Sequence, residues 1–93
     1  MSEAKHTPGP WINDGSGNIM HQDEQPIAFV NWTAYDAGQA NSRLIAESPN
    51  LLFALEAACD EIEGLVSRLG GTDPEKATKQ YRATIAKATG SAA

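Results

Sequence analysis

Residues 51–71, LLFALEAACDEIEGLVSRLGG, contain the clearest structural pattern in this chain of 93 residues. Apolar residues recur there at spacings of three and four, namely Leu52, Leu55, Cys59, Ile62, Val66 and Leu69. This spacing predicts a helix with one apolar stripe along its length. Gly70 and Gly71 indicate where the helix ends, because glycine is the commonest residue just past a helical C-terminus.

A second helix is predicted directly after this one. Asp73 can cap its N-terminus, Pro74 suits the first helical position, and Glu75 suits the positive end of the helix dipole. Because only residues 70–73 separate the two helices, we expect them to fold back on each other as a hairpin. The second helix should run to about residue 88 and bury Ala77, Tyr81, Ile85 and Ala88.

Before the long stripe, the sequence predicts another helix over residues 37–47, with Asp36 as a candidate N-cap. Pro49 disfavours helical geometry at Ser48, so we expect the chain to break near Ser48. The residues of this helix that are expected to face inward are Ala40, Leu44 and Ile45.

Residues 10–32 predict a small antiparallel sheet. The segment DGSGN, residues 14–18, is typical of a hairpin turn, since glycine and asparagine accept a positive φ. Short strands are expected around residues 11–12 and 18–22. Residues 26–32 are rich in β-branched and aromatic side chains and apolar on both faces, so we expect them to form the middle or best-covered strand.

These patterns together predict an α+β fold, in which a small three-stranded antiparallel β-sheet is followed by an amphipathic helical hairpin. We expect a single domain over residues 10–89, with the sheet in residues 10–32 and the helices in residues 36–89. Residues 1–9 are expected to form a flexible N-terminal arm, and residues 90–93 a frayed tail.

Composition and charge restrict the functional classes. The formal net charge is −5, and an acidic surface is repelled by phosphate backbones, so direct nucleic-acid binding is disfavoured. A single cysteine cannot form an internal disulfide, which gives no sign of an oxidising compartment. No apolar run approaches the ~20 residues needed to cross a bilayer. We therefore expect no membrane association and a cytoplasmic location.

The sequence contains no constellation that indicates catalysis. Two histidines and one cysteine, far apart in the sequence, are too few for a zinc site. Acid–base catalysis needs carboxyl groups whose pKa values burial has shifted apart. Three carboxylates of the long helix are instead expected to face water: Asp60, Glu61 and Glu63. We expect a protein that is not an enzyme and needs no cofactor.

Two segments occur in a fixed order, HTPGPW at residues 6–11 and ANSRLIAESPNLLFALE at residues 40–56. Together they resemble a widespread family of small phage and prophage proteins, whose pattern is HTPGPW followed by A-N-A-R-L-I-A-A-A-P-x-L-L-x-A-L-E. The chain departs from it with Ser42 in place of alanine and with Glu47-Ser48 in place of small residues. The resemblance implies an accessory gene of a bacterial virus and brings no catalytic residues with it.

The charges of the two long helices are unevenly placed, with an acidic stretch followed by a basic one. One interpretation is that the two helix faces complement each other in the hairpin. The other is that the acidic face docks on a basic partner surface that normally holds nucleic acid. The acids are Glu47, Glu56, Asp60, Glu61 and Glu63, and the bases are Lys76, Lys79, Arg82 and Lys87.

The resemblance and the acidic stretch lead to one hypothesis and two alternatives. The hypothesis is a non-enzymatic phage protein that inhibits a host defence protein or complex in the bacterial cytoplasm, as anti-CRISPR proteins do. Its expected partner-binding residues are Glu56, Asp60, Glu61, Glu63, Trp32 and Tyr35. The first alternative is an oligomeric sponge for a signalling nucleotide, with ligand-binding residues Arg43, Lys76, Lys79 and Arg82. The second is a structural or regulatory phage protein that self-assembles through the stripe of residues 52–69.

Overall fold

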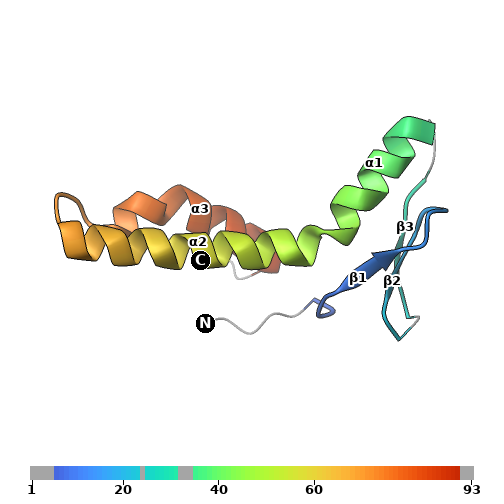
Figure 1. Ribbon diagram of the computed structural model, residues 1–93, viewed down its shortest axis with the longest axis horizontal. Coiled ribbons are helices and arrows are strands. Elements are labelled where there is room, and N and C mark those ends of the chain that lie inside the picture. Colours follow the sequence, from blue (N-terminus) through green and yellow to red (C-terminus); the bar gives the residue numbers. More distant parts are fainter. Residues whose placement is uncertain (1–5, 24, 32–34, 91–93) are drawn as a thin grey trace. The chain divides into compact units, whose positions relative to one another are not determined.

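The computed structural model describes residues 6–23, 25–31 and 35–90, and for Tyr35 and Asp36 it describes the backbone alone. The chain divides into two compact units, one formed by residues 6–51 and one that contains the residues from 52 onward. A three-stranded antiparallel sheet comes first and helices follow, so the predicted α+β fold is confirmed (Figure 1). The elements are β1 (Trp11–Asn13), β2 (Asn18–His21), β3 (Pro26–Phe29), α1 (Tyr35–Ala46), α2 (Ser48–Leu69) and α3 (Pro74–Thr89).

The sheet has the strand order β1-β2-β3, and both neighbouring pairs are antiparallel. β2 is therefore the middle strand, and its Ile19 is fully buried. The expectation that residues 26–32 form the middle or best-covered strand is wrong, because β3 ends at Phe29 and lies at an edge, where Phe29 is 68% exposed. Apolar composition indicates a strand, but the order follows from two tight turns, each of which places a strand beside its predecessor.

The turn between β1 and β2 is held by one carboxylate. Asp14 accepts hydrogen bonds from the Ser16 backbone nitrogen and hydroxyl, both at 2.8 Å, and from Nδ2 of Asn18 at 2.9 Å. These bonds, the one from Asn18 above all, lower the pKa of Asp14 to about 2. Gly15 and Gly17 have φ values of 87° and 99°, which glycine adopts without strain. The predicted hairpin turn is confirmed.

α1 packs against β1 and β2 and closes a small core in the first unit. Its inward face differs from the expected one, since Ser42 is fully buried whereas Leu44 is 62% exposed and Ala40 is exposed. Gly38, Ser42 and Ala46 are buried at intervals of four residues, and their small size allows a helix to lie close to a sheet. The core consists of Ile19, Val30 and Ala46, with Trp11, Ile27 and Ile45 packed against it.

The HTPGPW segment packs against the first turn of α2, within the first unit. A Cβ atom added to Gly9 would lie 2.9 Å from the Pro49 Cβ, so the backbone of Gly9 rests directly on the proline ring. Trp11 donates a hydrogen bond from Nε1 to the Thr7 carbonyl at 3.0 Å, and the His6 ring meets Trp11 edge-on. Pro49 follows the break between α1 and α2, which lies where the sequence predicted it.

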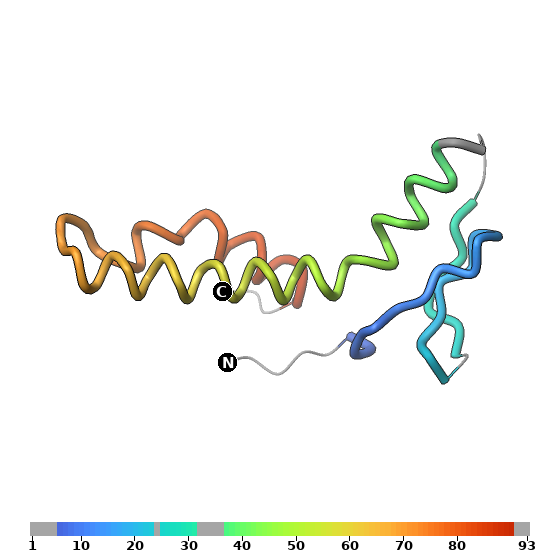
Figure 2. Tube along the Cα trace, in the orientation of Figure 1, coloured from blue at the N-terminus to red at the C-terminus, as the bar shows by residue number. Residues whose placement is uncertain are grey.

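In the second unit, the hairpin has the ends that its sequence predicts. Gly70 and Gly71, with φ values of 76° and 93°, follow α2 and turn the chain (Figure 2). Asp73 caps α3 by accepting a hydrogen bond from the Glu75 backbone nitrogen at 3.0 Å. Gly90 closes α3 in the left-handed conformation.

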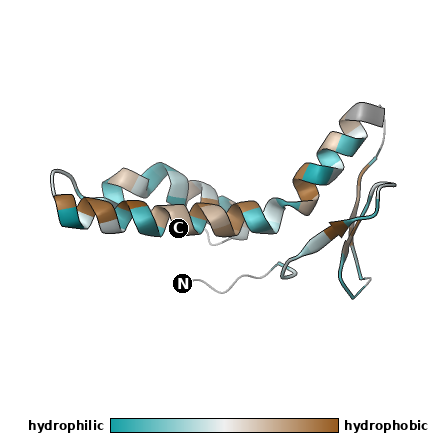
Figure 3. Ribbon diagram, in the orientation of Figure 1, coloured by the Kyte–Doolittle hydropathy of each residue, from teal (hydrophilic) through white to brown (hydrophobic). Residues whose placement is uncertain are grey.

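The contact between α2 and α3 uses only part of each predicted apolar face. On α2 Cys59 is fully buried, as its place in the stripe predicts, but Leu69 is 83% exposed. On α3 the buried residues are Thr78 and Ile85. Of the other residues expected to face inward, Tyr81 is 44% exposed, Ala88 is exposed, and Ala77 is partly buried. Figure 3 shows apolar colour recurring along α2 and paler, more polar colour on α3. The prediction of the inward face of α3 is confirmed for Ile85 and wrong for Tyr81 and Ala88, because part of that face is polar and includes Thr78.

Candidate functional site

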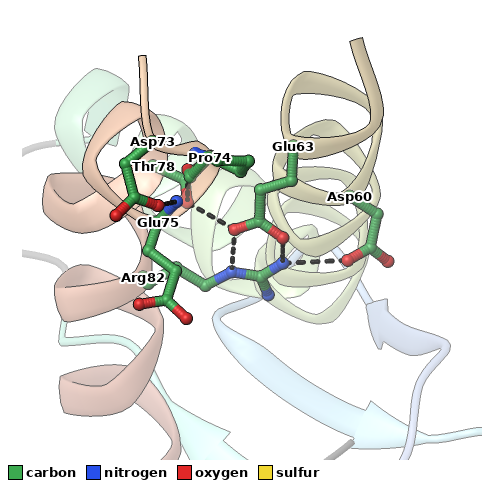
Figure 4. A network of polar contacts seen from close by, with 7 residues as sticks. All are labelled: Asp60, Glu63, Asp73, Pro74, Glu75, Thr78 and Arg82. Atoms are coloured by element: carbon green, nitrogen blue, oxygen red, sulfur yellow. Dashed lines mark hydrogen bonds and ion pairs between the residues drawn. The ribbon is translucent and has the colours of Figure 1, made fainter. Parts of the chain in front are cut away.

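A cluster of polar side chains joins α3 to α2. Arg82 donates from Nε and Nη2 to the two carboxylate oxygens of Glu63 at 3.0 and 2.8 Å, and from Nη2 to Asp60 at 2.8 Å (Figure 4). Thr78 donates its hydroxyl to Glu63 as well. Bidentate pairing of this kind matches the planar guanidinium to the planar carboxylate and fixes both side chains. We call Asp60, Glu63, Thr78 and Arg82 the Arg82 cluster.

The Arg82 cluster changes the acid–base properties of its members. The hydrogen bond from Arg82, followed by that from Thr78, lowers the pKa of Glu63 to about 2. The same contact with Glu63, together with that to Asp60, raises the pKa of Arg82 above its ordinary value. Both groups are therefore charged throughout the physiological range, which suits a fixed ion pair and does not suit proton transfer.

The Arg82 cluster bears on the two interpretations of the uneven distribution of charge along the helices. Arg82 of the basic stretch pairs with both Asp60 and Glu63 of the acidic stretch and compensates one of their two negative charges, so the helix faces complement each other in part at this point. The expectation that Glu63 faces water is wrong, because its side chain is only 28% exposed. The sequence spacing did not show this, since it left open how far α3 is rotated about its own axis.

The stability of the hairpin should depend on pH through Glu63. Its pKa in the folded protein, about 2, lies below the ordinary value of 4.5. Ionised Glu63 therefore stabilises the fold fully above about pH 4.5, and this contribution is lost as the pH falls through about 2. We expect Glu63→Gln to lower the melting temperature at pH 7 and to weaken the acid dependence of unfolding, followed by far-ultraviolet circular dichroism.

Glu75→Gln is the matched control, because Glu75 is an exposed carboxylate of the same hairpin. It removes a favourable interaction with the dipole of α3 but no contact of the Arg82 cluster, so its effect on unfolding should be smaller than that of Glu63→Gln. Equal pH profiles for Glu63→Gln and the wild type would contradict a stabilising role for the ion pair.

From Asp60 of the Arg82 cluster, a strip of four residues runs along α2 at spacings of four, three and four, and all of them except the half-buried Ala57 are exposed. Phe53 is 74% exposed, Asp60 is 76% exposed, and Ala57 and Gly64 carry little or no side chain. A Cβ atom added to Gly64 would meet nothing within 4 Å, so the surface there is open. We call Phe53, Ala57, Asp60 and Gly64 the docking strip. Its combination of an aromatic side chain, small neighbours and an oriented carboxylate suits contact with another protein.

The predicted partner-binding residues are thus distributed over different environments. Asp60 belongs to the docking strip, exposed Glu61 adjoins it on the same helix, Glu56 is half-buried, and Glu63 holds Arg82. Trp32 and the side chain of Tyr35 lie outside the described residues. Sequence reasoning missed Phe53, although a large aromatic residue outside the apolar stripe of an amphipathic helix signals such a site.

The proposed ligand-binding bases do not form a simple anion site. Lys79 and Arg82 line an open pocket of about 480 Å³ together with two carboxylates, Glu63 and Glu75. Arg82 is already engaged by acidic partners, and both carboxylates would repel a phosphate group. Lys76 is exposed on α3, and Arg43 is exposed on α1 in the other unit. This geometry argues against nucleotide binding at the pocket.

A family model described as Salmonella phage P22 protein Y8K6 matches residues 1–92. The chain belongs to this phage protein family. No curated protein and no solved structure matches it. The resemblance to a phage protein family, based on HTPGPW and residues 40–56, is thereby confirmed, and the match extends over both units of this P22 Y8K6 family member.

The described part of this family member lacks two features that would indicate other functions. Within residues 6–23, 25–31 and 35–90, no group of three or more histidine, cysteine, aspartate or glutamate side chains is arranged to hold a metal ion. None of the helices in that part of the chain has the length and apolarity to cross a membrane. Cys59 is a buried free thiol inside the helical hairpin.

Proposed function

We propose that this member of the P22 Y8K6 family is a non-enzymatic binding protein that inhibits a host antiviral defence system, of which a CRISPR complex is one example. It acts in the cytoplasm of the infected bacterium by occupying a protein surface. The docking strip on α2 is the observation that carries the proposal, and membership of a phage family supports the setting.

The docking strip suits protein binding for two physical reasons. Phe53 is 74% exposed, and burying an aromatic side chain in a partner's pocket is a frequent source of binding energy. Asp60 is held in place by Arg82 at 2.8 Å, so its carboxylate loses little conformational freedom when a partner binds. Ala57 between them and Gly64 one turn beyond Asp60 are small and allow a partner to approach the helix closely.

The strip also indicates the chemistry of the partner surface. An apolar pocket would receive Phe53, and a basic rim would face Asp60 and the neighbouring Glu61. Basic rims of this kind occur on proteins that bind nucleic acid, where carboxylates can take the place of phosphates. Defence complexes that recognise invading nucleic acid have such surfaces.

The test measures phage growth on a panel of host strains, each of which carries one defence system and expresses the chain. We expect the wild type to raise the efficiency of plating in at least one strain. Gly64→Arg should abolish the effect, because the new side chain covers the strip while arginine stabilises the helix by roughly 0.5–1 kcal/mol relative to glycine. Ala83→Arg, an equal change at an exposed position of α3, should retain it.

The plating results answer two questions separately: whether the chain inhibits a defence system, and whether the docking strip is the surface that does so. No rise in plating on any strain of a panel that covers the known defence classes would overturn the proposal of defence inhibition. A rise that Gly64→Arg leaves intact would place the binding surface elsewhere. Phe53→Asp provides an independent variant, since this exposed side chain is dispensable for the core and its loss should also abolish the effect.

A further inference from the structure

α2 carries a second apolar stripe that is covered only in part, since Leu55 and Ile62 in it are half-buried and its other members are exposed. Its residues follow spacings of three, four, three and four, the heptad pattern of helices that pack against other helices. Ala58 is exposed, Leu65 is 48% exposed and Leu69 is 83% exposed. Exposed leucines in a regular row are costly in water and indicate a missing partner. We call this row the outer stripe, and its members are Leu55, Ala58, Ile62, Leu65 and Leu69.

α3 extends this apolar surface. Arg82 reaches Asp60 and Glu63 along one side of the hairpin. At 3.6 residues per turn, the outer stripe lies on the other side of α2, and Tyr81 lies on the corresponding side of α3. Tyr81 is 44% exposed there. The hairpin thus has one polar side with the Arg82 cluster and one apolar side, and the apolar side belongs to both helices.

We propose that a second copy of this chain covers the apolar side, with the two α2 helices packed antiparallel. The argument for a second copy is charge complementarity. Glu61 and Arg68 are exposed, lie one heptad apart at the edge of the outer stripe, and bound a pocket of about 440 Å³ together with Gly64 and Leu65. When Ile62 packs opposite Leu65 of the second copy, each Glu61 lies beside an Arg68 of the other copy.

Other arrangements lack this complementarity. A parallel pair would place Glu61 opposite position 66, which carries valine. Shifting the antiparallel pair by one heptad, so that Leu65 packs opposite Leu55, would bring the two Glu61 side chains together. Like charges in contact oppose association. The pairing of Ile62 with Leu65 is also self-complementary, as a two-fold symmetric dimer requires.

The test is the oligomeric state of the full chain, measured by analytical ultracentrifugation from micromolar to millimolar concentration. The wild type should be a dimer. Leu65→Glu should weaken the dimer at least roughly a hundredfold, because two leucines lose their burial at once. Phe53→Glu is the matched control on the opposite side of α2 and should leave the dimer intact, and circular dichroism should show both variants folded.

A charge exchange tests the register. Glu61→Arg and Arg68→Glu should each weaken the dimer about fivefold, since each breaks two symmetric contacts of the modest energy typical of exposed ion pairs. The double variant should regain the wild-type affinity. A wild-type monomer at millimolar concentration, a dimer that Leu65→Glu does not weaken, or single exchanges that the double variant does not rescue would each overturn the proposal.

The docking strip and the outer stripe lie on different sides of α2, and Glu61, Gly64 and Arg68 lie between their centres. Phe53→Asp, which is remote from Glu61 and Arg68, therefore tests defence inhibition alone, whereas Leu65→Glu tests dimerisation. Failure of one proposal is therefore distinguishable from failure of the other.

Discussion

Replacement of Ile19 with alanine is expected to lower the free energy of unfolding of residues 6–51 by about 2–5 kcal/mol, the usual cost of truncating a fully buried isoleucine. Ile19 is 0% exposed and lies on the middle strand of the sheet. Among the described residues, the buried apolar side chains around it are Val30 and Ala46, with three half-buried ones packed against them, so few neighbours can move in to fill the space. Domains of this size have stabilities of about 5–15 kcal/mol, so the loss is a large fraction of the total.

Urea denaturation followed by tryptophan fluorescence measures this loss, because both tryptophans, Trp11 and Trp32, belong to residues 6–51. Ile12→Ala is the matched control on β1, where Ile12 is 45% exposed, and it should cost less than half as much. Equal effects of the two substitutions would contradict the assignment of Ile19 to the centre of the core. Circular dichroism of the same samples follows the helices, and coincident transitions would support the prediction of a single domain.

Replacement of Gly9 with alanine is expected to destabilise the protein by about 1–3 kcal/mol, the usual cost of forcing an extra carbon into a packed contact. The new Cβ atom would lie 2.9 Å from the Cβ and 3.4 Å from the Cγ of Pro49. The proline ring cannot rotate away as a flexible side chain would, so either the HTPGPW segment or the start of α2 has to shift. Thermal unfolding of the variant at neutral pH measures the effect.

Gly64→Ala is the matched control for Gly9→Ala. A Cβ atom at Gly64 meets nothing within 4 Å, and alanine is favoured over glycine in a helix by about 1 kcal/mol, so this variant should be more stable than the wild type. A Gly9→Ala variant as stable as the wild type would show that the contact with Pro49 does not constrain the fold. In that case, the bulkier substitution Gly9→Val should be tolerated as well.

The sequence predicted the elements whose causes are local. The stripe around Cys59, the capping of α3 by Asp73 and the break before Ser48 all depend on residues within one or two turns of each other. The turn at residues 14–18 follows likewise from its glycines and Asp14. Local propensity and periodicity therefore account for the α+β fold and for the ends of the hairpin helices, but not for the end of β3 at Phe29 or for the start of α1 at Tyr35, which places the expected N-cap Asp36 inside the helix.

The candidate site was predicted only in part. Asp60 and Glu61 were expected to be exposed and are. Glu63 was expected to face water, but Arg82, which lies 19 residues further along the chain, binds it. The outer stripe was invisible as a separate feature, because in the sequence it overlaps with the stripe that packs on α3.

Periodicity in the sequence establishes that α2 and α3 are amphipathic, because a helix turns at a fixed angle per residue whatever surrounds it. Which part of each apolar arc becomes buried depends on the rotation of the two helices about their axes, and that rotation is a property of their packing. The structure rotates α3 so that Thr78, Arg82 and Ile85 face α2, and Tyr81 does not. In the sheet, by contrast, local turns decide the strand order, and apolar composition alone misplaced residues 26–32 in the middle when β3 lies at an edge. Contacts between residues far apart in the sequence thus decided the Arg82 cluster, the docking strip and the uncovered apolar side.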